Sequence, residues 1–324
     1  EISFSKDDIN VEDLIAEEDM VITISHAGYI KRMPMDAYRT QKRGGRGVNA
    51  TKMKENDFIE NIFITTTHHT MYFFTNRGRL LRLKTFEIPE SNRNARGTAM
   101  INLLKLGENE KINTVLPLRD ADTSGYLTCV TASGMIKKTA LEEYMHSRQD
   151  GIRAINLKDG DELIDVHITS GTDELILVNR TGKAIRFSEE DVKPTGRATA
   201  GVRAMSLESG DQVVSMDIVR EDGKLLVLSE NGYGKRTDLS EYHTQSRAGK
   251  GVITLKVTEK TGMVASALIV RDNEEIMAIS HEGALIRTSV NDISTIGRAS
   301  QGVKVMKLDD GDSVIGTARF VDEN

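Results

Sequence analysis

The sequence contains no tryptophan, and aromatic residues make up only 5% of it. Proteins that bind single-stranded nucleic acid stack unpaired bases on aromatic side chains, so this composition argues against that class. Cysteine occurs once, at Cys129, which excludes an internal disulfide and favours a reducing compartment. Because Cys129 stands in an apolar run typical of a strand, we expect a small buried core residue rather than a reactive thiol.

Long apolar runs and processing signals are also missing. No stretch reaches the roughly 18 apolar residues of a membrane-spanning helix, and no signal peptide is visible, so we expect a cytoplasmic location and no membrane partner. The chain begins at Glu1, which indicates a fragment or a processed chain.

The motifs of common catalytic and metal sites are absent too. The sequence has no Walker loop, no Gly-x-Ser-x-Gly elbow and no His-Glu-x-x-His helix. His68 and His69 stand in a threonine-rich segment without a cysteine or carboxylate at ligand spacing. We therefore predict no catalytic residue, no metal and no cofactor in this chain.

Proline is scarce, at 4 residues, but glycine is frequent, at 27, and recurs with a regular spacing. Six glycines, 48 to 56 residues apart, are each followed four residues later by a cation, which we call the hairpin cation. These pairs are Gly28 with Arg32, Gly78 with Arg82, Gly134 with Lys138, Gly182 with Arg186, Gly232 with Arg236 and Gly283 with Arg287.

A second glycine follows in every copy, usually 19 residues later, and an arginine stands three or four residues before it. These glycines are Gly47, Gly97, Gly151, Gly201, Gly251 and Gly302. We call the arginines the loop arginines, and they are Arg43, Arg93, Arg148, Arg197, Arg247 and Arg298. Two independent markers that stay in phase indicate six repeats of about 50 residues.

Within each repeat the pattern is that of β-structure. In the fifth repeat, the apolar runs 213–219, 224–228, 233–237 and 252–255 are separated by Asp-Gly and Asn-Gly turns or a polar loop. Four antiparallel strands per repeat predict an all-β, six-bladed, propeller-like disc over residues 19–324, with residues 1–18 as a lead-in segment. Since the run 313–321 has no following copy, we expect the end of the chain to pair beside its beginning and close a ring.

One stretch differs in charge from the rest of the chain. The net charge is −6, yet residues 25–48 carry six cations against Asp36 alone. Their centre is Gln41-Lys42-Arg43-Gly44-Gly45-Arg46-Gly47, in which glycine exposes backbone amides and arginine can grip phosphates bidentately. The alternative is a flexible glycine turn with solvated charges.

The recurring cations suggest a function. Lysine or arginine on an exposed strand can serve only to prevent edge pairing, but glutamate would do so equally well. Two cations per repeat at fixed positions instead predict a continuous basic track that binds the phosphates of bent double-stranded DNA. The predicted DNA-binding residues are residues 41–47, Lys31, the hairpin cations and the loop arginines.

The segment 41–47 resembles the gyrase-A box, Gln-(Arg/Lys)-Arg-Gly-Gly-(Arg/Lys)-Gly, and the six repeats resemble the C-terminal DNA-wrapping domain of the bacterial DNA gyrase A protein. The resemblance implies a β-pinwheel, whose blades exchange strands, and right-handed wrapping of DNA that supports ATP-driven negative supercoiling. It also implies a nucleoid-associated A2B2 complex with the gyrase B protein, in which ATP and Mg²⁺ are used elsewhere, and a monomeric isolated domain. The acidic tail of many relatives is short here, with only Asp322 and Glu323.

Two other functions stay open at this point. A topoisomerase IV counterpart would bind DNA and steer substrate choice without strong wrapping. A protein-docking propeller of the kelch or WD-repeat type would leave the recurring cations unexplained, and Trp-Asp dipeptides cannot occur without tryptophan.

Overall fold

The computed structural model of the protein describes residues 11–35, 57, 59–92, 95–119, 124–145, 151–282 and 284–320. Residues 41–47, Arg93, Arg148 and Gly283 therefore lie outside the described residues. The chain divides into two compact units. The first comprises Glu1–Tyr72, Leu81–Leu106 and Val115–Asp122, and the second comprises Phe73–Leu80, Gly107–Thr114 and Thr123–Asn324.

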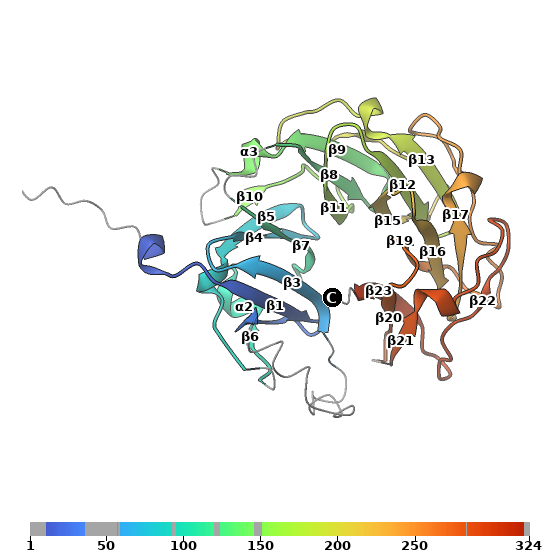
Figure 1. The fold of residues 1–324 in the computed structure, drawn as a ribbon. Coiled ribbons are helices and arrows are strands. Elements are labelled where there is room, and N and C mark those ends of the chain that lie inside the picture. The colour runs from blue at the N-terminus through green and yellow to red at the C-terminus, as the bar shows by residue number, and fades with distance from the viewer. Residues whose placement is uncertain are drawn as a thin grey trace, which may run out of the picture. The chain divides into compact units, whose positions relative to one another are not determined.

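The described strands form five sheets of four strands and one sheet of three (Figure 1). In spatial order, the first two sheets are β3 (Ile59–Thr66), β1 (Asp19–Ser25), β2 (Tyr29–Pro34), β6 (Thr98–Ala99), and β10 (Ile152–Arg153), β5 (Arg79–Lys84), β4 (Thr70–Thr75), β7 (Ile112–Leu118). The third and fourth are β11 (Leu163–Thr169), β8 (Tyr126–Thr131), β9 (Met135–Ala140), β14 (Val202–Arg203), and β15 (Val213–Ile218), β12 (Glu174–Asn179), β13 (Lys183–Ser188), β18 (Val252–Ile253). The last two are β19 (Val264–Val270), β16 (Lys224–Ser229), β17 (Tyr233–Asp238), β22 (Val303–Lys304), and β21 (Leu285–Ser289), β20 (Glu275–Ser280), β23 (Val314–Phe320).

Helices are few and short. They are the 3₁₀ helices η1 (Val11–Leu14), η2 (Thr85–Glu87), η3 (Glu189–Asp191), η4 (Leu239–Glu241) and η5 (Val290–Asp292), and the α-helices α2 (Met100–Leu103) and α3 (Glu142–Met145). Within the described residues, no helix has the length and apolar character needed to cross a membrane. The prediction of an all-β fold built from small antiparallel sheets is confirmed.

The outermost strand of each four-stranded sheet comes from the next repeat along the chain. β14 pairs with β9 rather than with the hairpin of its own repeat, and β18 pairs with β13 in the same way. β22 likewise pairs with β17. The strand exchange that the resemblance implied is therefore confirmed, and it ties consecutive repeats together through backbone hydrogen bonds.

Two predictions about strand pairing are wrong. The four strands of the fifth repeat do not form one blade, because β15 and β18 lie in the preceding sheet, while β16 and β17 lie in the next. Within the described residues, β23 pairs with β20, and β1 pairs with β2 and β3, so the predicted pairing of the end of the chain beside its beginning does not occur there. A sequence period gives the length of a repeat but not the strand at which each sheet begins.

Two of the recurring glycines, Gly201 and Gly232, show a steric reason for their fixed position within the repeat. Gly201 has φ +81°, and a Cβ at this position would lie 2.2 Å from the carbonyl oxygen of Ile136 in the sheet that receives β14. Gly232 has φ +83° in its hairpin, and a Cβ there would lie 2.2 Å from the carbonyl oxygen of Met306. Both positions combine a left-handed backbone with a close backbone approach, which only glycine tolerates without strain.

In the second unit the core lies between successive sheets, which pack face to face. Along β12, Leu175 shares a cluster of buried residues with Val130 of the preceding sheet, whereas the adjacent Ile176 shares one with Leu225 of the next sheet. Because both faces of a central strand are covered, these strands are continuously apolar rather than alternating. Cys129 is fully buried, as predicted, and burial raises the pKa of its thiol to about 12.

Four strands line the inner side of the second unit. β11, β15, β19 and β23 lie side by side, and their sheets extend outward from them (Figure 1). The two-residue strands β14, β18 and β22 are therefore at the opposite, outer edges of these sheets. This arrangement places the segments after Gly201, Gly251 and Gly302 on the outside of the unit.

Candidate nucleic-acid interface

Part of the predicted interface lies outside the described residues. This applies to residues 41–47, Arg93, Arg148 and the side chain of Arg287. Their role in DNA binding stays a prediction.

Most hairpin cations with described side chains connect a sheet to the next repeat. Each of four donates a hydrogen bond to a backbone carbonyl in or beside a short helical turn of the following repeat. The bonds run from Arg32 Nε to Ile88 (2.8 Å), from Lys138 Nζ to Glu189 (2.9 Å), from Arg186 Nη1 to Leu239 (3.1 Å) and from Arg236 Nε to Ile293 (2.7 Å). Such charge-assisted bonds are stronger than neutral ones.

Carboxylates also form ion pairs with hairpin cations, among them Arg186 and Arg236. Arg186 pairs with Glu174, and this hydrogen bond is the main reason that the pKa of Glu174 is lowered. Arg236 donates from Nη1 to Asp272 at 2.9 Å, and its side chain is only 8% exposed. Arg82, the remaining member, lies 5.1 Å from the centre of the Tyr72 ring. Four of the described hairpin cations, Arg32, Lys138, Arg186 and Arg236, thus hold repeats together through internal hydrogen bonds.

Lys31 is buried as well, and its Nζ donates to the carbonyl of Ala95 at 2.8 Å. The loop arginines with described side chains, Arg197, Arg247 and Arg298, are half-buried. Arg247 donates from Nε to Asp191 and from Nη1 to Arg203, both backbone carbonyls at 3.0 Å. Arg298 donates from Nη1 to the carbonyl of Ile253 at 2.7 Å. Each of these two loop arginines therefore reaches the exchanged strand of the previous repeat.

Three segments form a continuous outer surface, which we call the perimeter belt: residues 195–206, 245–256 and 296–307. Backbone hydrogen bonds join them, from Ser206 N to the carbonyl of Gly249 (2.9 Å) and from Lys256 N to the carbonyl of Ser300 (3.0 Å). The belt contains eight cations and no carboxylate, in a chain of net charge −6. Its fixed backbone and single sign of charge suit a polyanion.

The sequence prediction did not include the exposed belt cations on the exchanged strands. Arg203 and Lys304 are exposed and stand two residues after a second glycine, on the exchanged strands β14 and β22. Arg153 holds the same position on β10 and is exposed too. A cation two residues after the second glycine recurs in three of the six repeats, and this recurrence could have been noticed in the sequence. Only the pairing of β14 and β22 shows that the position lies at an outer edge of a sheet.

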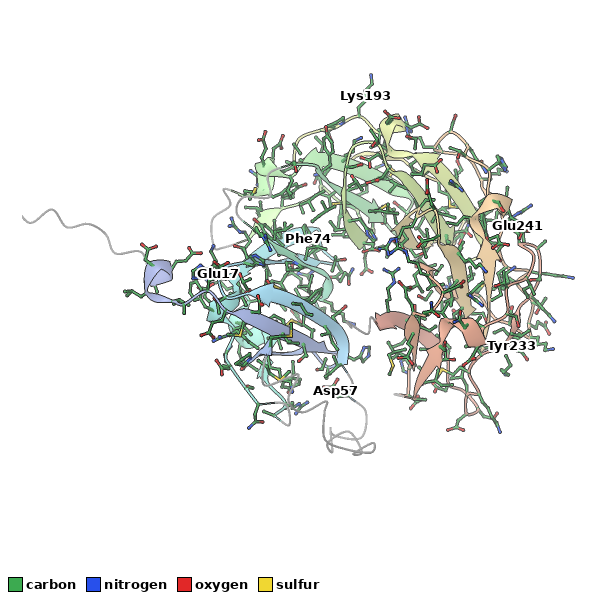
Figure 2. All side chains as sticks on the ribbon, viewed as in Figure 1. Glu17, Asp57, Phe74, Lys193, Tyr233 and Glu241 are labelled. Atoms are coloured by element: carbon green, nitrogen blue, oxygen red, sulfur yellow. The ribbon has the colours of Figure 1, made fainter. Side chains whose placement is uncertain are left out.

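An aromatic ring supports one end of the belt. Lys304 lies 4.6 Å from the centre of the Tyr233 ring, and Lys260 lies 5.3 Å from it. Tyr233 of β17 and Glu241 of η4 are on the outer side of the second unit (Figure 2). In the first unit, Arg96 is stacked 3.7 Å above the Tyr29 ring. Such cation–π contacts restrict where the cations can point.

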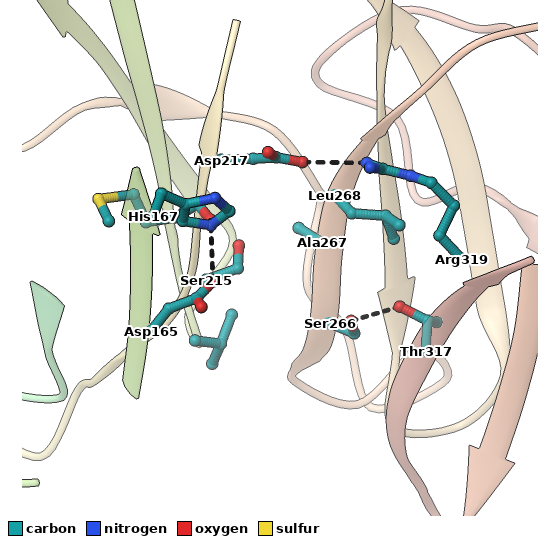
Figure 3. A pocket seen from close by; sticks show the side chains of 11 residues that line it. Asp165, His167, Ser215, Asp217, Ser266, Ala267, Leu268, Thr317 and Arg319 are labelled. Atoms are coloured by element: carbon teal, nitrogen blue, oxygen red, sulfur yellow. Dashed lines mark hydrogen bonds and ion pairs between the residues drawn. The ribbon is translucent and has the colours of Figure 1, made fainter. Parts of the chain in front are cut away.

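A polar pocket on the inner side of the second unit is a different candidate. Asp165 and His167 of β11, Asp217 of β15 and Arg319 of β23 line it (Figure 3). Burial lowers the pKa of His167, but Asp165 and Asp217 outweigh that effect and raise it to about 9. These groups are already paired, His167 with Asp165 at 3.0 Å and Arg319 with Asp217 at 3.3 Å, so the pocket is an ion-pair network.

Comparisons with known proteins agree with this geometry. Six consecutive segments match the family described as "DNA gyrase C-terminal domain, beta-propeller": residues 19–66, 70–119, 125–170, 173–220, 223–271 and 274–320. The DNA gyrase A protein of Clostridium acetobutylicum is 49% identical over 319 residues, which cover 98% of this chain and 38% of that protein. The corresponding protein of Salmonella typhimurium is 46% identical over 322 residues, covering 99% and 37%. The chain thus spans less than two fifths of the length of these relatives.

Two solved structures are similar over nearly the whole chain. The C-terminal domain of DNA topoisomerase IV superposes with a TM-score of 0.83, at 29% identity, over 94% of each chain. The DNA gyrase A C-terminal domain superposes with a TM-score of 0.74, also at 29% identity, over 94% of this chain and 100% of the other. The match of all six repeats shows that the chain belongs to the DNA gyrase C-terminal domain family.

Proposed function

We propose that the chain binds double-stranded DNA along the perimeter belt and bends the duplex around its outer edge. The observation that carries this proposal is the belt itself, in which eight cations and no carboxylate occupy three hydrogen-bonded segments. Contacts of this kind reach phosphates rather than base edges, so binding is independent of sequence.

The energetics of such binding are set by counterion release. Each phosphate neutralised on B-DNA contributes about −0.9 to the slope of log K against log salt concentration. If all eight belt cations met a phosphate, the belt alone would give a slope of about −7. Bending a few tens of base pairs costs on the order of 1–6 kcal/mol, which that number of contacts offsets.

The proposed DNA contacts are the belt cations and residues 41–47, in which Lys42, Arg43 and Arg46 supply the charge. Arg93 and Arg148 join them by their position in the repeat. We assign Lys31 and four hairpin cations instead to internal hydrogen bonds; these four are Arg32, Lys138, Arg186 and Arg236.

We further propose that the chain acts as part of the gyrase A protein in an A2B2 complex with the gyrase B protein. Wrapping on the belt would present a nearby duplex segment to the rest of the complex, where ATP and Mg²⁺ are used and negative supercoils are introduced. That activity implies association with the nucleoid.

A second function is favoured by one observation, the TM-score of 0.83 to a topoisomerase IV C-terminal domain. In that case the belt would bind DNA and steer substrate choice without strong wrapping. The two functions differ in whether bound DNA changes its linking number, and both differ from a protein-docking propeller in requiring DNA affinity.

The test is the affinity for a linear duplex, measured by fluorescence anisotropy between about 50 mM and 300 mM salt. We expect steep salt dependence, and we expect the double variant Arg203→Ala with Lys304→Ala to make the slope less negative by about 2. Lys158→Ala is the matched control, because this exposed lysine lies in the acidic turn before Asp159. Salt-independent binding, or equal effects of the control and the double variant, would refute the proposal.

A further inference from the structure

A lysine precedes the hairpin cation in alternate repeats. These residues are Lys31, Lys137 and Lys235, while Leu81, Ile185 and Ile286 hold the position in the other repeats. Lys137 and Lys235 are fully buried, and Lys31 is 6% exposed. A buried ammonium group is costly unless hydrogen-bond acceptors surround it, so its partners show what these lysines do.

Lys235 directs its donors to a single loop of the perimeter belt. Its Nζ lies 2.8 Å from the carbonyl oxygen of Gly297, 2.5 Å from that of Arg298 and 3.1 Å from that of Ser300. The loop in turn is hydrogen-bonded on its outer side, where the amide of Arg298 donates to Glu241 Oε1 at 3.1 Å. The backbone carbonyl of the loop arginine Arg298 thus accepts a hydrogen bond from the buried ammonium group of Lys235.

Lys137 repeats this arrangement two repeats earlier along the chain. Its Nζ donates to the carbonyls of Gly196 (3.4 Å), Arg197 and Ala154. The Tyr144 ring lies 5.9 Å away, and the Tyr144 hydroxyl donates to the same Ala154 carbonyl at 3.0 Å. Burial lowers the pKa of Lys137 to about 8, so the group is still mostly charged at neutral pH.

The loop at residues 245–251 is packed differently. The sheet beneath it carries Ile185 at the lysine position, and a Cβ built on Gly249 would lie 3.3 Å from Ile185 Cδ1. An aliphatic side chain offers no donor to loop carbonyls. The belt therefore contains two classes of loop. In one class a buried lysine donates hydrogen bonds to the loop carbonyls, and in the other the loop packs against an apolar side chain.

The lysine contacts have a direct consequence for the DNA interface. The carbonyls of Arg197 and Arg298 accept hydrogen bonds from buried lysines, which fixes the backbone from which each arginine side chain extends. We propose that Lys137 and Lys235 are positioning residues for DNA binding, which hold Arg197 and Arg298 on the perimeter belt without touching DNA themselves. This inference rests on the proposed function.

The test is a double-mutant cycle in the 324-residue chain, with Lys235→Met, Arg298→Ala and the combination, using linear duplex DNA. Each single variant is expected to weaken binding about fivefold at about 0.1 M salt and to make the salt slope less negative by about 0.9. The double variant is expected to match Arg298→Ala alone, because Lys235 acts through Arg298.

Stability controls separate positioning from a general loss of folding. Leu226→Ala removes a buried side chain of the neighbouring strand β16 and is expected to lower the unfolding midpoint while leaving the salt slope unchanged. If Lys235→Met and Arg298→Ala instead have additive effects on binding, or if Lys235→Met leaves binding unchanged, the inference is overturned while the proposed function stands. If the unmodified chain does not bind DNA at low salt, the proposed function itself is overturned.

Discussion

Replacing Arg236 by methionine separates the two roles that a hairpin cation could have. Its side chain is 8% exposed, donates to the carbonyl of Ile293 at 2.7 Å, and pairs with Asp272, which is 64% exposed. A hydrogen bond from a charged donor contributes about 1.5–3 kcal/mol, and an ion pair with so exposed a partner contributes less than about 1 kcal/mol. We therefore expect the free energy of unfolding to fall by about 2–4 kcal/mol.

The matched control is Arg203→Met, because Arg203 is exposed on β14 and makes no side-chain hydrogen bond among those identified in the described residues. This variant is expected to change stability by less than about 0.5 kcal/mol and to make the DNA salt slope less negative by about 0.9. Urea denaturation followed by circular dichroism, together with anisotropy titrations at several salt concentrations, measures both quantities. A stable Arg236→Met variant with a reduced salt slope would refute the assignment of Arg236 to an internal contact.

Three further predictions follow from individual contacts. Glu241→Gln removes a carboxylate beside the amide of Arg298 and is expected to tighten DNA binding about twofold in anisotropy titrations, more than Glu282→Gln, an exposed carboxylate outside the belt. Burial lowers the pKa of His167, but Asp165 outweighs that effect and raises it from 6.5 to about 9. Protonated His167 therefore contributes up to about 3 kcal/mol to the free energy of unfolding. This contribution is complete below about pH 6.5 and is lost as the pH rises through about 9. Urea denaturation at about pH 6 and pH 9.5 should show this loss, and His167→Gln should lack it. Gly201→Ala places a Cβ 2.2 Å from the carbonyl oxygen of Ile136 at φ +81° and is expected to cost at least about 2 kcal/mol, whereas no reduction in the urea midpoint would contradict the close approach.

The sequence was sufficient for the repeat and its strands, because glycine markers such as Gly201 and Gly232 have a steric cause. Gly201 combines a left-handed backbone with a close approach to the carbonyl oxygen of Ile136, so only glycine fits there, and its recurrence marks the repeat. The assignment of β15 to the preceding sheet was not readable, since the run 213–219 is equally apolar in either sheet. Pairing between distant strands is decided by packing across the whole repeat.

The sequence also could not predict which cations face the interior and which face outward. Lys138 and Arg203 are both recurring positive residues, and the sequence reveals the charge but not the direction in which each side chain points. Lys138 faces Glu189 in the interior, with a side chain only 4% exposed, whereas Arg203 is on an outer edge. Sequence reasoning expected a basic outer track but placed it partly on residues that connect the repeats.

The most direct measurement of the central claim is the linking number of DNA closed in the presence of this chain. Nicked plasmid is mixed with the protein, sealed by ligase, deproteinised and resolved by gel electrophoresis. We predict a positive shift that grows with protein concentration and is lost when Lys42, Arg43 and Arg46 are replaced by alanine, while Lys158→Ala leaves it intact. Binding without any shift would contradict wrapping and favour the topoisomerase IV-like function, and an unchanged plasmid with no binding at low salt would contradict both.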